Sequence, residues 1–213
     1  MKVLGISGSP RRGRTTGQLV QAVLDGCECD TGFLSLAGKR IGPCIACLGC
    51  VETNVCVLKD DLAGLRERIV NADAYVIGGA NFFSTLNGLA HCFLERWYQF
   101  RHREAKAVAG KLGVAVGVGG GDPQPAIEQI ATFFRYNQIE CIGSVGAQGA
   151  ACCFECGYGE TCKVGAVHML FGPGTKITPE IIPDLSKQPE SLDQARSLGR
   201  QLSARLRELA AGT

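Results

Sequence analysis

The sequence has no run of eighteen apolar residues, so it predicts no membrane-spanning helix. Its amino-terminal apolar stretch is too short, and turns polar too soon, for a signal peptide, and we therefore expect the protein in the cytoplasm. It also has little imbalance of charge, because 22 basic and 20 acidic residues leave a formal net charge of +2. Such a balance argues against nucleic acid or an acidic membrane as a partner. The three histidines show no mutual spacing of metal ligands.

Cysteine, in contrast, is abundant, with twelve residues in a chain of 213. In the cytoplasm, cysteines are more often metal ligands, catalytic thiols or buried fillers than disulfides. Spacing of the form C-x2-C-x2-C-x5-C favours an iron–sulfur cluster, because zinc usually takes two separated cysteine pairs. Zinc is the alternative at this site. The four cysteines with this spacing are Cys44, Cys47, Cys50 and Cys56.

A second group of cysteines lies in residues 148–190, a segment too long for an ordinary strand-to-helix connection. We interpret this segment as an insertion with its own function rather than a separate domain. Its cysteines are compatible with a second iron–sulfur cluster, a zinc ion, a redox-active thiol pair, or packing alone. Neighbouring side chains point opposite ways in an extended chain, so Cys152 is expected to be a poorer ligand than the other three. The group comprises Cys152, Cys153, Cys156 and Cys162.

A phosphate-binding loop is predicted near the amino terminus. Residues 2–6 form a buried strand pattern, and a helix with apolar residues at helical spacing follows the loop. Backbone N–H groups, the positive end of the helix, hydroxyls and arginines would face an anion there. The loop matches neither G-x-G-x-x-G nor G-x4-G-K-[ST]. The residues predicted to bind the phosphate group are Ser7, Ser9, Pro10, Arg11, Arg14, Thr15 and Thr16.

The rest of the chain alternates strand and helix patterns, which predicts a doubly wound α/β fold with a five-stranded parallel sheet in a single domain, residues 1–213. Helix starts are expected near Lys59 and near residue 89, and the latter helix is expected to run to about residue 103. Loops after the first, third and fourth strands should meet at the carboxyl edge of the sheet, where ligands bind. The four-cysteine loop, residues 44–56, follows the second strand and is expected at the same edge.

These features resemble the iron–sulfur flavoproteins of the flavodoxin-like NAD(P)H-dependent FMN reductase superfamily. The compact cysteine spacing of residues 44–56, the phosphate loop and the aromatic loop at residues 81–84 carry the resemblance. It implies strand order 2-1-3-4-5, with one FMN and one [4Fe-4S] cluster per chain. Two departures are Asn81, where relatives usually have proline, and His91, where many have lysine in Lys-x-x-x-Asp-Arg. Glu95 and Arg96 keep the acid–arginine pair.

The resemblance also implies where the flavin lies and what the protein does. The FMN phosphate would contact the amino-terminal loop, and the isoalloxazine would contact residues after the third and fourth strands. The implied function is electron exchange between a ferredoxin-like donor and the flavin, in a homodimer or homotetramer. The alternatives are an NAD(P)H-dependent FMN or quinone reductase with a structural metal, and a thiol or metal redox sensor. The isoalloxazine contacts would be Asn81, Phe82, Phe83, Ser84, Gly119, Gly120 and Gly121.

Overall fold

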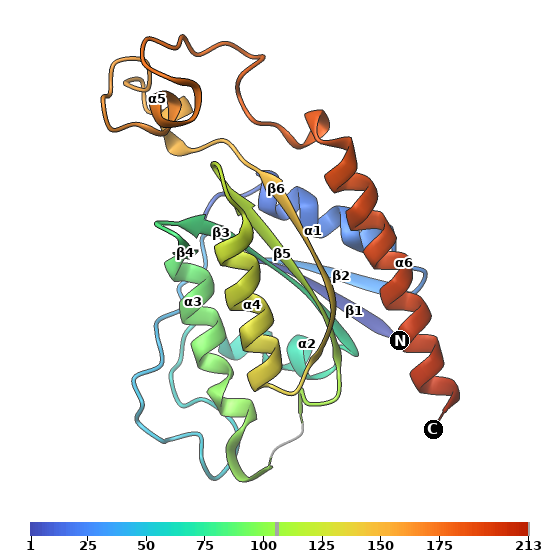
Figure 1. The fold of residues 1–213 in the computed structure, drawn as a ribbon. Helices are drawn as coiled ribbons and strands as arrows, with labels where there is room; N and C mark the ends of the chain where they lie inside the picture. Colours follow the sequence, from blue (N-terminus) through green and yellow to red (C-terminus); the bar gives the residue numbers. More distant parts are fainter. Residues whose placement is uncertain (105–106, 213) are drawn as a thin grey trace.

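The computed structural model describes residues 1–104 and 107–212, and its centre is a twisted parallel sheet (Figure 1). The order of the long strands is β2-β1-β3-β5-β6, and each neighbouring pair is parallel. This confirms the flavodoxin-like order predicted for five strands, with one short strand, β4, added at the end of β3. The strands are β1 (Lys2–Ser7), β2 (Asp30–Ser35), β3 (Ala74–Phe82), β4 (Thr85–Leu86), β5 (Leu112–Gly119) and β6 (Glu140–Gln148).

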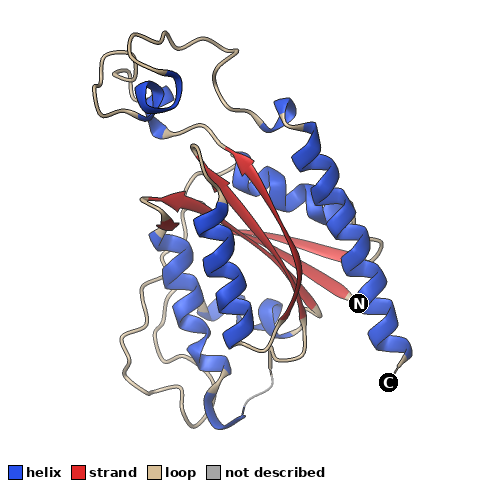
Figure 2. Cartoon of the chain, viewed as in Figure 1, coloured by secondary structure: helices blue, strands red, loops and turns tan. Residues whose placement is uncertain are grey.

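Helices cover both faces of the sheet (Figure 2). Successive strand residues point to opposite faces, so Val3 packs with α1 and α6, whereas Leu4 packs in the core under α3 and α4. Each face therefore has its own apolar core, and the carboxyl edge of the strands is left free of the helices for a ligand. The helices are α1 (Thr15–Asp25), α2 (Arg66–Val70), α3 (Gly88–Glu95), α4 (Gln124–Tyr136), α5 (Ala166–Phe171) and α6 (Pro189–Ala211).

Strand β3 is longer than the sequence pattern predicts. Its last residues pair with β4 in a tight antiparallel hairpin, so residues 81–84 are not a simple loop. The two turn residues, Phe83 and Ser84, have φ of 54° and 58°. Left-handed φ at both central positions is typical of type I′ turns, where glycine and asparagine are the common residues. Because the backbone disfavours this conformation for phenylalanine, no hairpin is predicted from the residue types at this turn.

Two helix predictions need correction. The helix expected from Lys59 begins later, as a short 3-10 turn (Ala63–Leu65) followed by α2. The helix expected over residues 89–103 is divided into α3 and a 3-10 segment (Arg96–Phe100). Trp97 at this junction is fully buried, with four aromatic rings edge-on at 5.1–5.7 Å between centroids. This packing makes the 3-10 segment a firm base for its polar neighbours.

Residues 148–190 are mostly irregular and lie beyond the end of β6 (Figure 1). The segment contains α5 and the 3-10 turns Cys152–Phe154 and Leu185–Lys187. Phe154 is largely buried and meets Phe171 edge-on, with ring centroids 6.2 Å apart. This long connection is thus a folded element held over the carboxyl edge of the sheet. Among the described residues, no helix has the length and apolar character needed to cross a membrane.

Candidate flavin cavity and cysteine loop

A cavity of about 540 Å³ lies at the carboxyl edge of the sheet, a size typical of ligand sites. Ten of the fourteen residues predicted to hold the flavin line it, and they come from three separate loops. The exceptions are Ser7, which is buried and faces a neighbouring pocket, and three exposed residues, Pro10, Ser84 and Gly121. The ten lining residues are Ser9, Arg11, Arg14, Thr15, Thr16, Asn81, Phe82, Phe83, Gly119 and Gly120.

The end of the cavity predicted to bind phosphate is the start of α1. No side chain among the described residues caps this helix, so its first N–H groups are available to an anion. Ser9 and Thr16 are buried beside it. Two predicted phosphate ligands also have protein partners, since an Nη2 atom of Arg11 donates to the Ala150 carbonyl at 2.7 Å and Arg14 pairs with Glu155 at 2.7 Å. The Arg14 pair is half-exposed, and such surface pairs are weak enough to be exchanged for a phosphate.

Asn87, which sequence reasoning missed, holds the phosphate loop against β3. Its buried side chain accepts the Ala80 N–H at 3.0 Å and donates to the Gly8 carbonyl at 2.8 Å. Gly8 must be glycine, because a Cβ there would lie 2.6 Å from the Cβ of Ala90. In the sequence, Asn87 is only an asparagine just before a helix, a pattern that predicts a helix cap rather than a link between two loops.

Asn81 gives the cavity one polar atom, Oδ1, that has no partner among the described residues. Its Nδ2 donates to the Asp122 carbonyl at 2.7 Å, which orients the amide. Its buried Oδ1 has no hydrogen bond within the described chain. Buried polar atoms are rarely left unpaired, so this oxygen suits an N–H donor of a bound ligand such as the flavin ring. The site therefore fits FMN at both ends, with anion donors at one and an unpaired acceptor at the other.

The insertion supplies the remaining wall, and this contribution was missed by sequence reasoning. The topology contained the signal, because any segment following a parallel strand starts at the carboxyl edge. The insertion residues that line the cavity are Gly149, Ala150, Ala151, Cys152, Cys153, Val164, Ala166 and Met169.

A larger groove of about 610 Å³ lies between α3 and α4, but it is a poorer flavin site. Its charged lining residues are Glu95, Arg101 and Glu128. Two carboxylates would repel a phosphate, and the groove contains none of the ten predicted residues. The smaller cavity is therefore the better candidate for the flavin.

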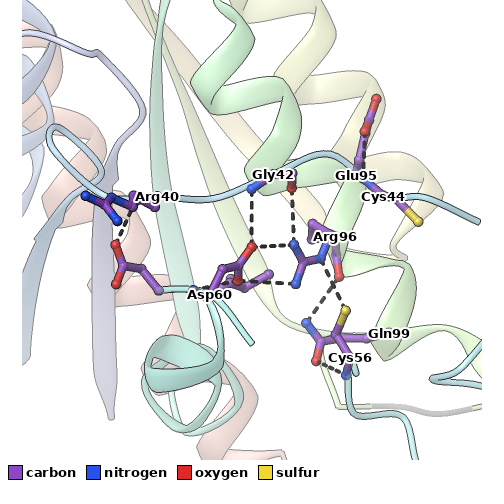
Figure 3. Close-up of polar contacts among 10 residues, drawn as sticks. Arg40, Gly42, Cys44, Cys56, Asp60, Glu95, Arg96 and Gln99 are labelled. Carbon is purple, nitrogen blue, oxygen red and sulfur yellow. Dashed lines mark hydrogen bonds and ion pairs between the residues drawn. The ribbon is translucent and has the colours of Figure 1, made fainter. Parts of the chain in front are cut away.

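Arg96 joins the two ends of the cysteine loop, here called the loop neck, and its side chain is only 1% exposed (Figure 3). One nitrogen of Arg96 lies 2.7 Å from Asp60 Oδ2 and donates to the Gly42 carbonyl at 3.2 Å. Its Nε donates to Cys56 Sγ, also at 3.2 Å. Arg96 therefore joins the segment before the first cysteine to the segment after the last one, and touches a predicted ligand sulfur directly.

The Asp60 carboxylate is charged in this network. Burial alone would raise the pKa of Asp60, but hydrogen bonds from Arg96 and from the Gly42 N–H outweigh it and lower the pKa. The sequence suggested that Asp60 starts a helix, because acids favour a helix amino end. Asp60 does accept the Leu62 N–H at 3.1 Å, so it caps the turn before Ala63 while it also pairs with the buried Arg96 guanidinium.

Two further side chains fix the ends of the loop. Glu95 accepts the Cys44 N–H and Gln99 accepts the Cys56 N–H, each at 3.1 Å (Figure 3). In the middle of the loop, burial raises the pKa of the Cys50 thiol, and the nearby sulfurs of the other three loop cysteines raise it further. The four thiols are thus electrostatic neighbours. Nevertheless, no three His, Cys, Asp or Glu side chains in the described residues already form a metal site, so ligation would require the thiols to turn inward.

The position of the loop differs from the expectation. It leaves the carboxyl edge after β2 and then runs beside α3 toward the end of that helix (Figure 1). No residue of 42–58 lines the candidate flavin cavity. The reason is the set of polar partners on residues 95–99, which hold the loop against the helix instead of the sheet edge.

This fold and cavity define a flavodoxin-like flavin-binding protein. A family model described as NADPH-dependent FMN reductase matches residues 1–146, and the chain belongs to this family and, within it, to the iron–sulfur flavoproteins. It is accordingly a flavin-dependent oxidoreductase. An iron–sulfur flavoprotein of Methanocaldococcus jannaschii is 32% identical over 149 residues, covering 67% of this chain and 76% of the relative.

Two further comparisons agree with this placement. An iron–sulfur flavoprotein of Archaeoglobus fulgidus is 32% identical over 152 residues, covering 68% of this chain and 78% of the relative. The solved structure of a Trp repressor binding protein from Bacillus subtilis has a TM-score of 0.59 at 18% identity, covering 92% of this chain and 98% of that one. At that identity the likeness concerns the fold alone.

Proposed function

We propose that the protein holds FMN in the 540 Å³ cavity and a [4Fe-4S] cluster on loop 44–56, and passes single electrons between a ferredoxin-like partner and the flavin. FMN supplies one- or two-electron chemistry, and the cluster supplies one-electron transfer. The observation that carries the proposal is the convergence of ten predicted flavin residues on one cavity with an uncapped helix start.

The chain's own residues have separate tasks in this proposal. The N–H groups at the start of α1, with Ser9 and Thr16, bind the phosphate; Asn81 Oδ1 accepts from the flavin ring. The thiolates of the four loop cysteines hold the cluster, and the Arg96 guanidinium hydrogen-bonded to Cys56 Sγ stabilises negative charge there. Proton transfer by a protein side chain is not needed for electron transfer itself.

The separation of the cysteine loop from the cavity bears on the assembly. Because the two sites share no lining residue in one chain, we propose a homodimer or homotetramer in which the cluster of one chain approaches the flavin of its neighbour. Size-exclusion chromatography with light scattering tests this, and a monomer would contradict it.

A second candidate function is reduction of the flavin by NAD(P)H, with the metal centre serving a structural role. The description of the matching family, NADPH-dependent FMN reductase, favours it. Anaerobic mixing with NADPH separates the two functions. Rapid flavin bleaching by NADPH supports the second candidate, whereas bleaching only by a reduced ferredoxin supports the first.

Thr16→Val should weaken FMN binding about ten-fold or more, because a hydrogen bond to a charged group contributes roughly 1.5–3 kcal/mol. The Thr16 methyl group packs against Gly78 and lies 3.1 Å from where a Cβ on Gly78 would be. Valine therefore keeps this packing and removes only the hydroxyl. Quenching of FMN fluorescence on titration of the apoprotein gives the dissociation constant.

Thr85→Val is the matched control, because Thr85 lies on the hairpin but does not line the cavity. Its FMN affinity should equal that of the unchanged protein. Equal affinities for both variants would exclude the start of α1 as the phosphate site.

A further inference from the structure

The cysteines of the insertion repeat a spacing already used in the chain. The last three cysteines of loop 44–56 follow C-x2-C-x5-C, and Cys153, Cys156 and Cys162 follow the same spacing. The family match ends at residue 146, so this second group lies outside the part of the chain that the family model describes. We propose that these three cysteines, with Cys152 as the fourth thiolate, bind a second iron–sulfur cluster beside the flavin cavity of the same chain.

Close contacts in the insertion connect the three cysteines to Cys153 and to the Gly165–Ala166 backbone. Cys153 Sγ accepts the Ala166 N–H at 3.2 Å, a contact that stabilises a thiolate. Cys162 Sγ is 3.4 Å from where a Cβ would be on Gly165, the residue before Ala166. Cys156 Sγ lies 3.6 Å from the carbonyl oxygen of Cys153. Residues far apart in the segment are thus gathered around Cys153 and Ala166.

A glycine makes this arrangement possible. A Cβ on Gly159 would lie 2.1 Å from the Cys153 carbonyl oxygen, so only glycine allows the chain to return so closely to Cys153. After it, the Cys162 N–H bonds to the Tyr158 carbonyl at 2.9 Å and closes a turn. Backbone N–H groups that donate to the ligand sulfurs are one of the factors that set the reduction potential of an iron–sulfur cluster.

Cys152 is the best fourth ligand in the described insertion. Residues 152–154 form a 3-10 turn, so the side chains of Cys152 and Cys153 diverge by about 120° rather than pointing opposite ways. The other candidate, His168, has its Nε2 engaged with the Glu160 carbonyl at 2.9 Å. The described thiols are not yet grouped as a finished metal site, so ligation would draw their side chains together and release their protons.

The location would let this second centre exchange electrons with the flavin of its own chain. Cys152 and Cys153 line the cavity assigned to the flavin, whereas loop 44–56 does not reach it. The insertion is also joined to the phosphate loop, through the Arg14–Glu155 ion pair and the bond from Arg11 to the Ala150 carbonyl. This aspect rests on the proposed function, since the cavity must hold FMN. One electron from the reduced flavin would convert one ferric iron of the cluster to ferrous. A ferredoxin-class protein would then accept that electron and return the iron to ferric.

The test is metal analysis of the full chain, purified anaerobically and reconstituted with ferrous iron and sulfide. The unchanged protein should hold about eight irons and eight sulfides per chain, as two four-iron clusters require. The variant C153S/C156S should keep about four irons, and the matched variant C47S/C50S should also keep about four. Cys141→Ser, an exposed cysteine outside both groups, should change nothing.

The outcomes separate this inference from the proposed function. An iron count in C153S/C156S equal to that of the unchanged protein would overturn the second cluster and leave the first intact. Zinc that is present in the unchanged protein and lost from C153S/C156S would overturn it as well. Unchanged iron in C47S/C50S would instead refute the proposed function. Should C153S/C156S fail to fold, alkylation of the native reconstituted protein decides: the four insertion cysteines are protected if they bind a cluster and react with iodoacetamide if they do not.

Discussion

Cys47→Ser should abolish the cluster of loop 44–56 while FMN stays bound, with a loss of about four irons per chain. Serine is a poor ligand because its hydroxyl does not ionise near neutral pH, whereas a cluster needs thiolates. Cys47 is exposed, so the substitution should leave the free energy of unfolding nearly unchanged. Flavin content should also hold, since no residue of the loop lines the cavity. Iron, sulfide and FMN assays on the anaerobic protein measure these quantities.

Cys141→Ser controls for the loss of any exposed thiol and should retain full iron. If Cys47→Ser keeps its iron, or if the unchanged protein holds stoichiometric zinc at this loop, the assignment of the first centre is wrong. Loss of FMN together with iron would show that the two sites depend on each other within one folded unit, contrary to the separation seen in the cavity lining.

Arg96→Met should destabilise the protein by about 3 kcal/mol, the lower end of the range for breaking a buried ion pair. The lower end applies because the Asp60 side chain is 19% exposed and keeps its bonds from the Gly42 and Leu62 N–H groups. Methionine fills a similar volume, so the loss is mainly electrostatic. Urea unfolding followed by the fluorescence of the single tryptophan, Trp97, measures the change.

The control for Arg96→Met is another arginine that contacts the cysteine loop. Arg103 pairs with Glu52 at 2.7 Å, but both side chains are mostly exposed, so Arg103→Met should cost less than about 1 kcal/mol. Similar losses for the two variants would show that burial of the Arg96 pair contributes nothing, and so contradict this account of the loop neck.

The Arg96 effect should depend on pH. The pKa of Asp60 is lower in the folded than in the unfolded chain, so its contribution to stability is present above about pH 4 and is lost as the pH falls through the folded value. The difference in unfolding free energy between the unchanged protein and Arg96→Met should therefore shrink in acid. A difference that stays constant from pH 7 to pH 3 would mean that packing, not charge, is responsible.

The sheet could be predicted because apolar strand patterns alternate with helix patterns along the first 147 residues. The phosphate loop was also recognisable, since hydroxyls and arginines gather between a strand and a helix. Ten of the fourteen predicted flavin residues, from this loop and from the two later segments, meet in one cavity. Parallel topology forces this meeting, because loops that follow parallel strands all emerge at one edge.

Other features depended on contacts distant in sequence. Nothing local shows that Arg96 is buried against Asp60, because the two are 36 residues apart. The path of the cysteine loop beside α3 follows from the same partners. The Phe83–Ser84 turn uses left-handed backbone that these residue types disfavour, so no turn signal was present. The insertion was recognised by its length, but its place over the cavity follows from the end of β6.

An anaerobic dithionite titration, followed by visible absorption and electron paramagnetic resonance, tests most directly whether flavin and iron–sulfur centres share this chain. Full reduction of FMN consumes about two electrons and each cluster about one more, so the reconstituted protein should take up about four per chain, or about three if only loop 44–56 binds a cluster. A signal of reduced iron–sulfur protein should appear as the visible band fades. Uptake that ends at about two electrons, with no such signal, would contradict the account.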